Sequence, residues 1–325
     1  MYKSFYGLKE NPFNVNPDPR YLYLTKQIEE TLTGLMYGIQ TRKGFITLTG
    51  EVGTGKTMLV NRLLDWLHHR RTRTAFLFNS RMNSSQLFDF ILAEFEINCE
   101  SRSKSQQLMR LNHWLLERYR AGETVVLIID EAQNLTFPVL EEIRLLTNLE
   151  TSTEKLIQIV LSGQPEFEEK LKLPQLRQLR QRIMLRCLTI PFTQEQTHEY
   201  IRERLRIAGA NNEPIFSAKT MDTVHLYSMG IPRVINLLCE YSLVNGFAGA
   251  QRPIQPETVE EVAREFQLDE VSPIAAEGSF VDTEVYNSEA FLQNLGETLS
   301  RFRMSPTPTP PRGKSDLTKK RNDSW

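Results

Sequence analysis

Eight consecutive residues have the types and the spacing that bind phosphate. They are Gly50, Glu51, Val52, Gly53, Thr54, Gly55, Lys56 and Thr57, and they follow the apolar run 45–49. A helical pattern starts at Met58, which we also expect to contact the nucleotide. Glycines allow backbone N–H groups to curl around an anion, and the start of a helix adds the positive end of its dipole. Lysine reaches the β and γ phosphates, and the threonine hydroxyl binds Mg²⁺. A chance match in a turn would lack the strand before the loop and the helix after it, so the pattern predicts binding of ATP with Mg²⁺.

Two carboxylates, Asp130 and Glu131, directly follow the apolar run 124–129. A run without polar side chains is typical of a central parallel strand that is covered on both faces. Open α/β sheets bind their ligands at the carboxyl ends of such strands. We expect Asp130 to hold Mg²⁺, directly or through water, and Glu131 to orient and deprotonate the attacking water. The alternative is an ordinary acidic turn.

A polar side chain after the next apolar run, 156–161, could reach the γ-phosphate or the lytic water. Gln164 is the first candidate and Ser162 the second. The alternative is that Gly163, Gln164 and Pro165 form only a turn.

Arginines are candidates for stabilising the charge of a transition state. Arg182 is the first choice for a finger that reaches the nucleotide of a neighbouring subunit, ahead of Arg180 and Arg177. Such a finger can raise the rate by about 10³–10⁵, whereas surface arginines usually make only weak ion pairs. Arg233 follows Pro232, which is favoured in a first helical turn. From a helix start, Arg233 could fold back onto the phosphates, or it could be structural.

The elements that would position these groups are short strands alternating with helices. We expect strands at 45–49, 74–78, 124–129, 156–161 and 185–188 and helices at 25–40, 85–95 and 104–119, and we expect 173–183 to be basic and helical. Helical patterns then continue at 194–208, 217–229, 232–246 and 256–266. This order predicts an α/β fold with a parallel five-stranded sheet flanked by helices, followed by a small all-α lid domain.

The chain divides into four predicted segments. Residues 1–24 are rich in aromatics and proline and are expected to form an extended arm, whose rings pack rather than bind a ligand. The ATPase core is expected at 25–192 and the lid at 193–268. Residues 269–325 are expected to be a linker with a marginal amphipathic helix and a largely disordered tail.

Charge, cysteine spacing and hydropathy limit which binding partners and which cellular locations are consistent with the sequence. The formal net charge is −1, so only local patches such as 68–73 or 312–321 could attract nucleic acid. For 68–73, basic residues that end a helix are the simpler interpretation. The three cysteines have no metal-type spacing. Neither a signal peptide nor an apolar run of about 18 residues is found, which favours a cytoplasmic protein, free or peripheral at the inner membrane.

These motifs together resemble those of AAA+ ATPases, and the chain is most similar to the general secretion pathway protein A group. The resemblance covers roughly 1–268 and rests on 50–57, 126–135, 162–166, 176–183 and 230–236, together with the arm. It implies ATP hydrolysis at a site between the subunits of a homo-oligomer, with Lys56 and Thr57 on phosphate and Mg²⁺ and Asp130 and Glu131 as the Walker B pair. It also implies Gln164 as sensor 1, Arg182 as the finger and Arg233 as sensor 2.

Two functions fit this resemblance. The first is a motor or switch that assembles a secretion, pilus or polysaccharide-export machine. The second is an ATP-dependent DNA-binding regulator that recruits a transposase, because the same core also resembles transposition ATPases of the TnsC and TniB type.

Overall fold

The structure is a computed structural model that describes residues 2–14, 18–78, 81–101, 103–211 and 214–268. Met1–Ser272 is one compact unit. The predicted linker, amphipathic helix and tail at 269–325 lie outside the described residues. None of the helices in the described ranges is long and apolar enough to cross a membrane.

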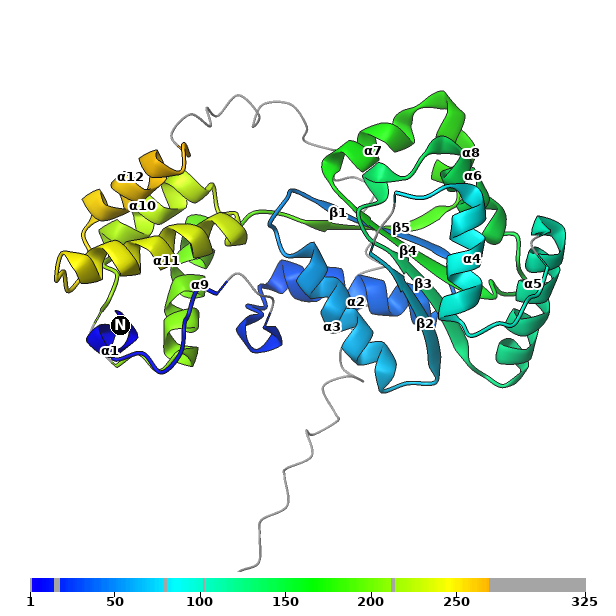
Figure 1. Cartoon of the computed structure of the whole chain (residues 1–325), viewed down its shortest axis with the longest axis horizontal. Helices are drawn as coiled ribbons and strands as arrows, with labels where there is room; N and C mark the ends of the chain where they lie inside the picture. Colours follow the sequence, from blue (N-terminus) through cyan, green and yellow to red (C-terminus); the bar gives the residue numbers. More distant parts are fainter. Residues whose placement is uncertain (1, 15–17, 79–80, 102, 212–213, 269–325) are drawn as a thin grey trace, which may run out of the picture. The chain divides into compact units, whose positions relative to one another are not determined.

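Five parallel strands form a single sheet in the order β2-β3-β4-β1-β5 (Figure 1). The strands are β1 (Phe45–Gly50), β2 (Thr72–Leu77), β3 (Thr124–Ile129), β4 (Ile157–Gly163) and β5 (Ile183–Thr189). The predicted sheet is therefore confirmed, with small shifts of the strand ends. Because the strands are parallel, their carboxyl ends lie at one edge, where the residues after β1, β3 and β4 meet.

Helices cover both faces of the sheet. One face packs against α2 (Lys26–Gln40) and α3 (Lys56–His68), and it includes Val126 and Ile128 of β3. The other face packs against four helices and includes Val125, Leu127 and Ile129 of the same strand. Those helices are α4 (Ser84–Glu94), α5 (Lys104–Arg120), α6 (Phe137–Leu146) and α7 (Pro165–Lys172). Alternate residues of β3 thus enter two hydrophobic cores, which confirms its prediction as a central strand.

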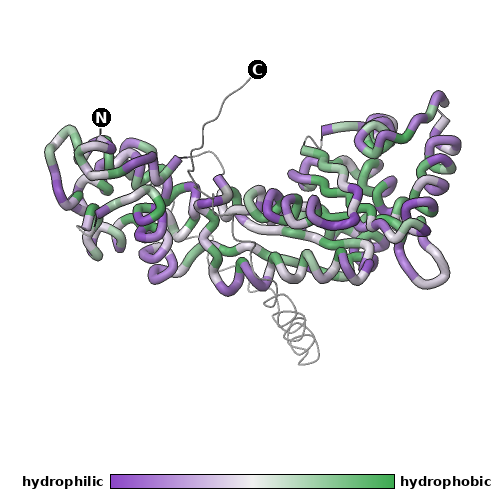
Figure 2. Tube along the Cα trace, turned by 90° about the horizontal axis from the view of Figure 1, so that it is seen from below, coloured by the Kyte–Doolittle hydropathy of each residue, from purple (hydrophilic) through white to green (hydrophobic). Residues whose placement is uncertain are grey.

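Local sequence explains where these helices begin. The Thr25 side chain caps α2 by accepting a hydrogen bond from Ile28 N, and Asn83 forms a capping box with Gln86 at the start of α4. Helices α6 and α7, which the sequence analysis did not predict, each have proline in the first turn. Hydrophobic and hydrophilic stretches alternate along the helices in Figure 2, as expected for helices with one buried face.

The prediction of a helix over 173–183 is only partly correct. Pro174 instead starts a short 3-10 turn, η3 (Pro174–Leu176), which continues into the four-residue helix α8 (Arg177–Arg180). Leu176 and Leu179 are buried in the core, while Arg177 is exposed. Burial of these two leucines therefore anchors this basic segment in the core beside α6 and α7.

Helices α9 (Gln194–Ile207), α10 (Ala218–Ser228), α11 (Pro232–Ala248) and α12 (Pro256–Glu265) share a hydrophobic cluster with the N-terminal arm. The arm is not wholly extended as predicted, because it contains helix α1 (Tyr2–Tyr6) and the 3-10 turn η1 (Pro19–Tyr21). The prolines at 12 and 17 lie beyond α1 and do not restrict it. The prediction that the aromatics pack is confirmed, since Tyr6, Phe13 and Tyr21 are buried.

Replacement of Phe13 by alanine should detach the arm. The ring is completely buried and meets Phe216 edge to face at 6.2 Å, so the variant should lose about 3–5 kcal/mol of unfolding free energy. Chemical denaturation of the full chain measures this loss. Phe78, which is 74% exposed, is the matched control, and Phe78→Ala should change stability by less than about 0.5 kcal/mol. Equal effects of the two substitutions would contradict this account of the arm.

Candidate functional site

The phosphate-loop residues form a tight turn between β1 and α3. Gly53 and Gly55 have positive φ values of 84° and 99°, a region that side chains with a Cβ rarely adopt. A Cβ on Gly55 would meet no atom within 4 Å. The left-handed backbone conformation, not crowding, therefore requires glycine at the start of α3.

The base of the loop is fixed against the neighbouring strand β5. Thr54 Oγ1 lies 2.7 Å from Thr189 Oγ1, and both side chains are buried. A Cβ on Gly50 would lie 2.0 Å from the same Thr189 hydroxyl oxygen. The loop therefore depends on close backbone approach between β1 and β5, which the sequence analysis did not recognise.

Lys56 is a buried cation held against its own loop. Its Nζ donates to the carbonyl oxygens of Gly50 at 2.6 Å and Glu51 at 2.9 Å. Burial lowers the pKa of Lys56, while the charges of Glu131 and Asp130 oppose this shift. An ammonium in this position is suited to an anionic ligand, because phosphate would return the solvation that burial removes.

Asp130 and Ser162 bring the ends of β3 and β4 together. Asp130 is largely buried, and its Oδ1 accepts hydrogen bonds from Ser162 Oγ at 2.7 Å and from Glu131 N at 2.9 Å. Ser162, the second candidate for a side chain near the γ-phosphate, is thus a partner of the Asp130 carboxylate. Thr57 is exposed at the start of α3.

Glu131 and Gln164 are in direct contact. Gln164 Nε2 donates to Glu131 Oε2 at 3.1 Å, and Gln133 Nε2 donates to the same oxygen. Glu131 has a φ of 54°, unusual for a residue with a side chain. Strain of this kind is found at functional sites that the surrounding structure holds in place.

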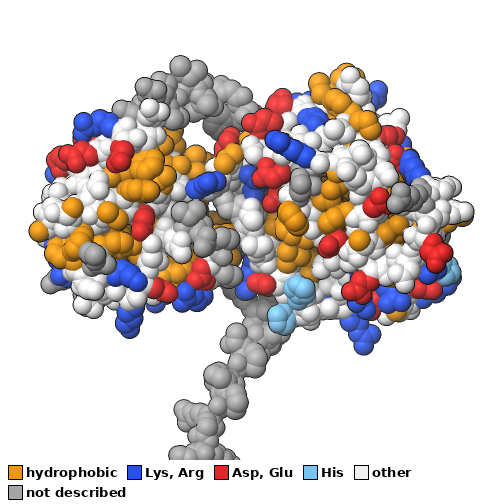
Figure 3. Space-filling model, in the orientation of Figure 1, with side chains coloured by type: hydrophobic (Ala, Val, Ile, Leu, Met, Phe, Trp, Pro, Cys, Tyr) orange, Lys and Arg blue, Asp and Glu red, His pale blue; other side chains and the backbone are white. Residues whose placement is uncertain are grey.

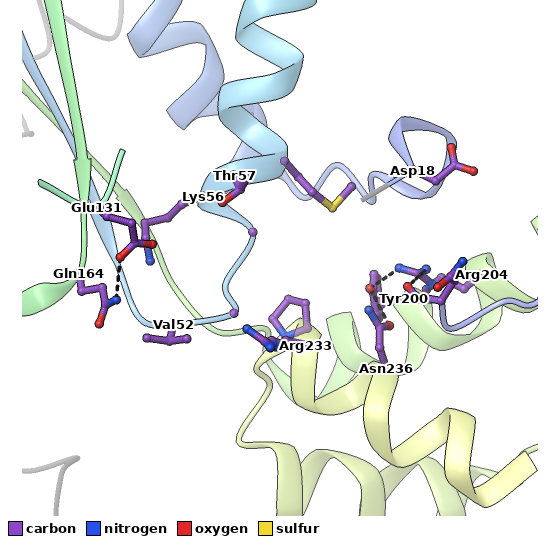
Figure 4. Close-up of a pocket in the computed structure, with 15 residues that line it drawn as sticks. Asp18, Val52, Lys56, Thr57, Glu131, Gln164, Tyr200, Arg204, Arg233 and Asn236 are labelled. Atoms are coloured by element: carbon purple, nitrogen blue, oxygen red, sulfur yellow. Dashed lines mark hydrogen bonds between the residues drawn. The ribbon is translucent and has the colours of Figure 1, made fainter. Parts of the chain in front are cut away.

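A cavity of about 370 Å³ lies against the phosphate loop (Figure 4). On one side it is lined by Val52, Gly53, Gly55, Lys56, Thr57, Met58, Glu131 and Gln164. On the other side it is lined by Asn14, Asp18, Tyr200, Arg204, Pro232, Arg233 and Asn236. Most of the predicted phosphate-loop residues therefore share one cavity with Glu131, Gln164 and Arg233.

Arg233 lies at the beginning of α11, as its sequence position predicted. Its backbone N–H donates to Gly53 O at 3.3 Å, and its Cβ would be 2.8 Å from a Cβ on Gly53. The start of α11 therefore packs directly on the loop.

The sequence analysis did not identify the cavity-lining residues Tyr200 and Arg204 of α9 or Asn236 of α11. Arg204 is buried, and it donates to Pro12 O at 2.5 Å and to Tyr200 OH at 2.7 Å. Tyr200 OH donates to Asn236 Oδ1 at 2.9 Å. These bonds join the arm, α9 and α11. The α9 sequence has arginines at 202, 204 and 206, and nothing in their spacing marks Arg204 as the buried one.

Arg182 does not line this cavity. It precedes β5, at the amino end of the sheet, whereas the loop follows the carboxyl end of the parallel strand β1. The Arg182 Nη1 donates to Thr147 Oγ1 at 2.9 Å. Arg182 is partly buried, whereas Arg177 is exposed. The choice among Arg182, Arg180 and Arg177 as a finger stays a prediction.

The side chains fit a nucleotide phosphate with a divalent cation. The cavity joins a buried ammonium to a threonine hydroxyl, and the Asp130 carboxylate, at the end of β3, bonds to Ser162 of β4, the strand next to β1. Within the described ranges, no cluster of three or more His, Cys, Asp or Glu side chains could hold a metal by itself. Mg²⁺ typically takes one or two protein ligands and completes its shell with phosphate and water, so this sparse donor set suits it.

Comparisons with known proteins agree with this geometry. The AAA domain family matches residues 39–171. General secretion pathway protein A of Aeromonas hydrophila is 43% identical over 255 residues, which are 78% of this chain and 46% of that protein. The chain thus spans less than half the length of this relative.

Solved structures share the fold at low sequence identity. Cdc6p of Pyrobaculum aerophilum superposes with a TM-score of 0.59 at 19% identity, over 78% of this chain and 70% of that one. The ORC2 protein of Aeropyrum pernix, in complexes with ADPNP and ADP, gives a TM-score of 0.56 at 14% identity, over 81% and 75%.

The parallel sheet, the phosphate loop and these matches lead to one assignment. The chain is an AAA+ P-loop protein similar to general secretion pathway protein A.

Proposed function

We propose that the protein binds ATP with Mg²⁺ and hydrolyses it to ADP and phosphate. The observation that carries this proposal is that Lys56 and Glu131 line one cavity, so a phosphate-binding cation and a candidate base face the same space. The neighbour in complexes with ADPNP and ADP supports nucleotide as the ligand class.

The side chains divide the work of hydrolysis among themselves. Lys56 and the backbone N–H groups of the loop hold the phosphates. Glu131 orients a water and accepts its proton, and Gln164 holds the Glu131 carboxylate and faces the same space. Thr57 and Asp130 would hold Mg²⁺, which when bound neutralises charge on the phosphate oxygens.

The side of the cavity formed by the arm, α9 and α11 would bind the nucleoside and respond to nucleotide binding. Arg233 lies beside the loop through the bond from its N–H to Gly53 O, so its guanidinium can reach phosphate. Tyr200 and Arg204 provide aromatic and polar groups farther from Lys56 (Figure 4), and Asn14 also lines the cavity. Nucleotide binding would therefore couple the core to the arm and to α11, which belongs to the helical region 193–268 that we interpret as the lid.

We further propose that the protein works as a homo-oligomeric motor or switch in assembly of a secretion machine. The similarity to general secretion pathway protein A supports this pathway over recruitment of a transposase. On the face shown in Figure 3, charges of both signs are interspersed with hydrophobic side chains. That mixture suits a protein client better than a strongly acidic polymer. We propose a location in the cytoplasm, either free or peripheral at the inner membrane.

Glu131→Gln tests hydrolysis separately from binding. The amide keeps the shape of the side chain but cannot accept the proton of water, so kcat should fall by about 10²–10⁴ while ATP affinity stays near the wild-type value. Phosphate release and binding of a fluorescent ATP analogue measure the two quantities. Glu94→Gln, an exposed site on α4, should change neither. Undiminished turnover in Glu131→Gln would exclude Glu131 as the base.

Lys56→Met should abolish phosphate binding and also alter the pH dependence of stability. The folded pKa of Lys56 lies below the ordinary value of 10.5, so between those two values the unfolded chain holds more protons and stability rises with pH. The methionine variant should lack this increment. Urea unfolding without nucleotide, from neutral pH upward, measures it. Lys26→Met, whose lysine side chain is 91% exposed, should keep the wild-type pH dependence, and an unchanged pH dependence in Lys56→Met would contradict burial of the charge.

Arg182→Ala tests whether a second subunit completes the site. If Arg182 is the finger, turnover should fall by about 10³–10⁵ with ATP affinity unchanged. Mixing Arg182→Ala with Glu131→Gln should then restore part of the activity, because one mixed interface contains both intact groups. Arg177→Ala and Arg180→Ala serve as matched comparisons. Full turnover by Arg182→Ala would move the finger to one of these two positions.

A further inference from the structure

Gln133 makes side-chain contacts that the catalytic scheme above does not use. It lies in the 3-10 turn η2 (Ala132–Asn134), directly after Glu131. Its Nε2 donates to Glu131 Oε2, and its Oε1 accepts a hydrogen bond from Gln164 N at 3.1 Å. One partly buried amide therefore contacts both the candidate base and the residue after β4.

Both glutamines act on the same carboxylate oxygen. Glu131 Oε2 accepts from Gln133 Nε2 and from Gln164 Nε2, the latter at 3.1 Å. Two donors on one oxygen restrict rotation of the carboxyl group more than either donor alone. They define how the Glu131 carboxylate is turned at the edge of the cavity.

Gln133 is itself held in place by α7 and β4. Lys170 Nζ of α7 donates to Gln133 O at 3.0 Å and also to Leu135 O, which fixes the turn. A Cβ on Gly163 would lie 3.2 Å from Gln133 Oε1, so glycine at this position permits the close approach. The amide therefore has a fixed support, as a residue that orients another group requires.

We propose that Gln133 is a positioning residue for hydrolysis. It orients the Glu131 carboxylate and links it to Gln164, so that the base and the residue after β4 act as one unit. This inference rests on the proposed role of Glu131. Small displacements of a reacting group can cost up to about a hundredfold in rate, so loss of this support should reduce turnover without affecting nucleotide binding.

Two substitutions at Gln133 separate its donor from its acceptor. Gln133→Ala removes both contacts. Gln133→Glu keeps an acceptor for Gln164 N but loses the donor and places a second carboxylate beside Glu131. Both variants should lower kcat by about tenfold or more, with the KM for ATP, the affinity for an ATP analogue and the thermal midpoint unchanged. Gln106→Ala and Gln106→Glu, at an exposed position on α5, should retain wild-type values.

A double-mutant cycle with Gln164→Ala tests the link between the two amides. Because both act through one oxygen, the loss in Gln133→Ala/Gln164→Ala should be clearly smaller than the product of the two single losses. A strictly multiplicative loss would overturn the shared unit. Wild-type kcat in Gln133→Ala, or a fall in affinity and thermal midpoint that accounts for the lost activity, would overturn the positioning role.

Glu131→Gln keeps the two proposals distinguishable. If Glu131→Gln is inactive while Gln133→Ala turns over normally, only the inference about Gln133 fails. If Glu131→Gln turns over like the wild type, the proposed role of Glu131 itself fails, and the inference about Gln133 fails with it.

Discussion

Burial of the Lys56 ammonium is the constraint on which the site depends. The charge is largely removed from water, and its Nζ donates to the carbonyl oxygens of Gly50 and Glu51. Desolvation of a cation destabilises the fold unless an opposite charge compensates. A loop built around this cation is therefore poised for an anion, and the rest of the fold keeps the loop in shape.

The parallel sheet supplies that support. Since β1 lies between β4 and β5, its loop is held from one side by Thr189, and on the other side Ser162 of β4 bonds to Asp130 at the end of β3. No local pattern specifies the order of the strands. That order places the Thr189 contact beneath the loop and brings the carboxylates of Asp130 and Glu131 to the same edge of the sheet. Rigid elements of this kind hold functional side chains more precisely than loops do.

The helical side of the cavity has a different character. Its groups come from the arm, α9 and α11, and they are joined through Arg204, Tyr200 and Asn236. Hydrogen bonds from a buried guanidinium to backbone carbonyls such as Pro12 O are satisfied only when the arm is in place. The arm therefore lines the cavity, in addition to packing its aromatic rings against the helices as predicted.

The sequence by itself determined the sheet and the residues at its carboxyl edge, because strand periodicity and the loop from Gly50 to Thr57 are local patterns. It missed α6 and α7, overextended the helix near Pro174 and treated the arm as wholly extended, since short helices depend on burial of residues such as Leu176. Only the tertiary structure could reveal the support given by Gln133 and the wall around Arg204. Hydrogen bonds between Gln133 and Gln164, or between Arg204 and Pro12, join residues 31 and 192 positions apart, and no spacing rule along the chain encodes such pairings.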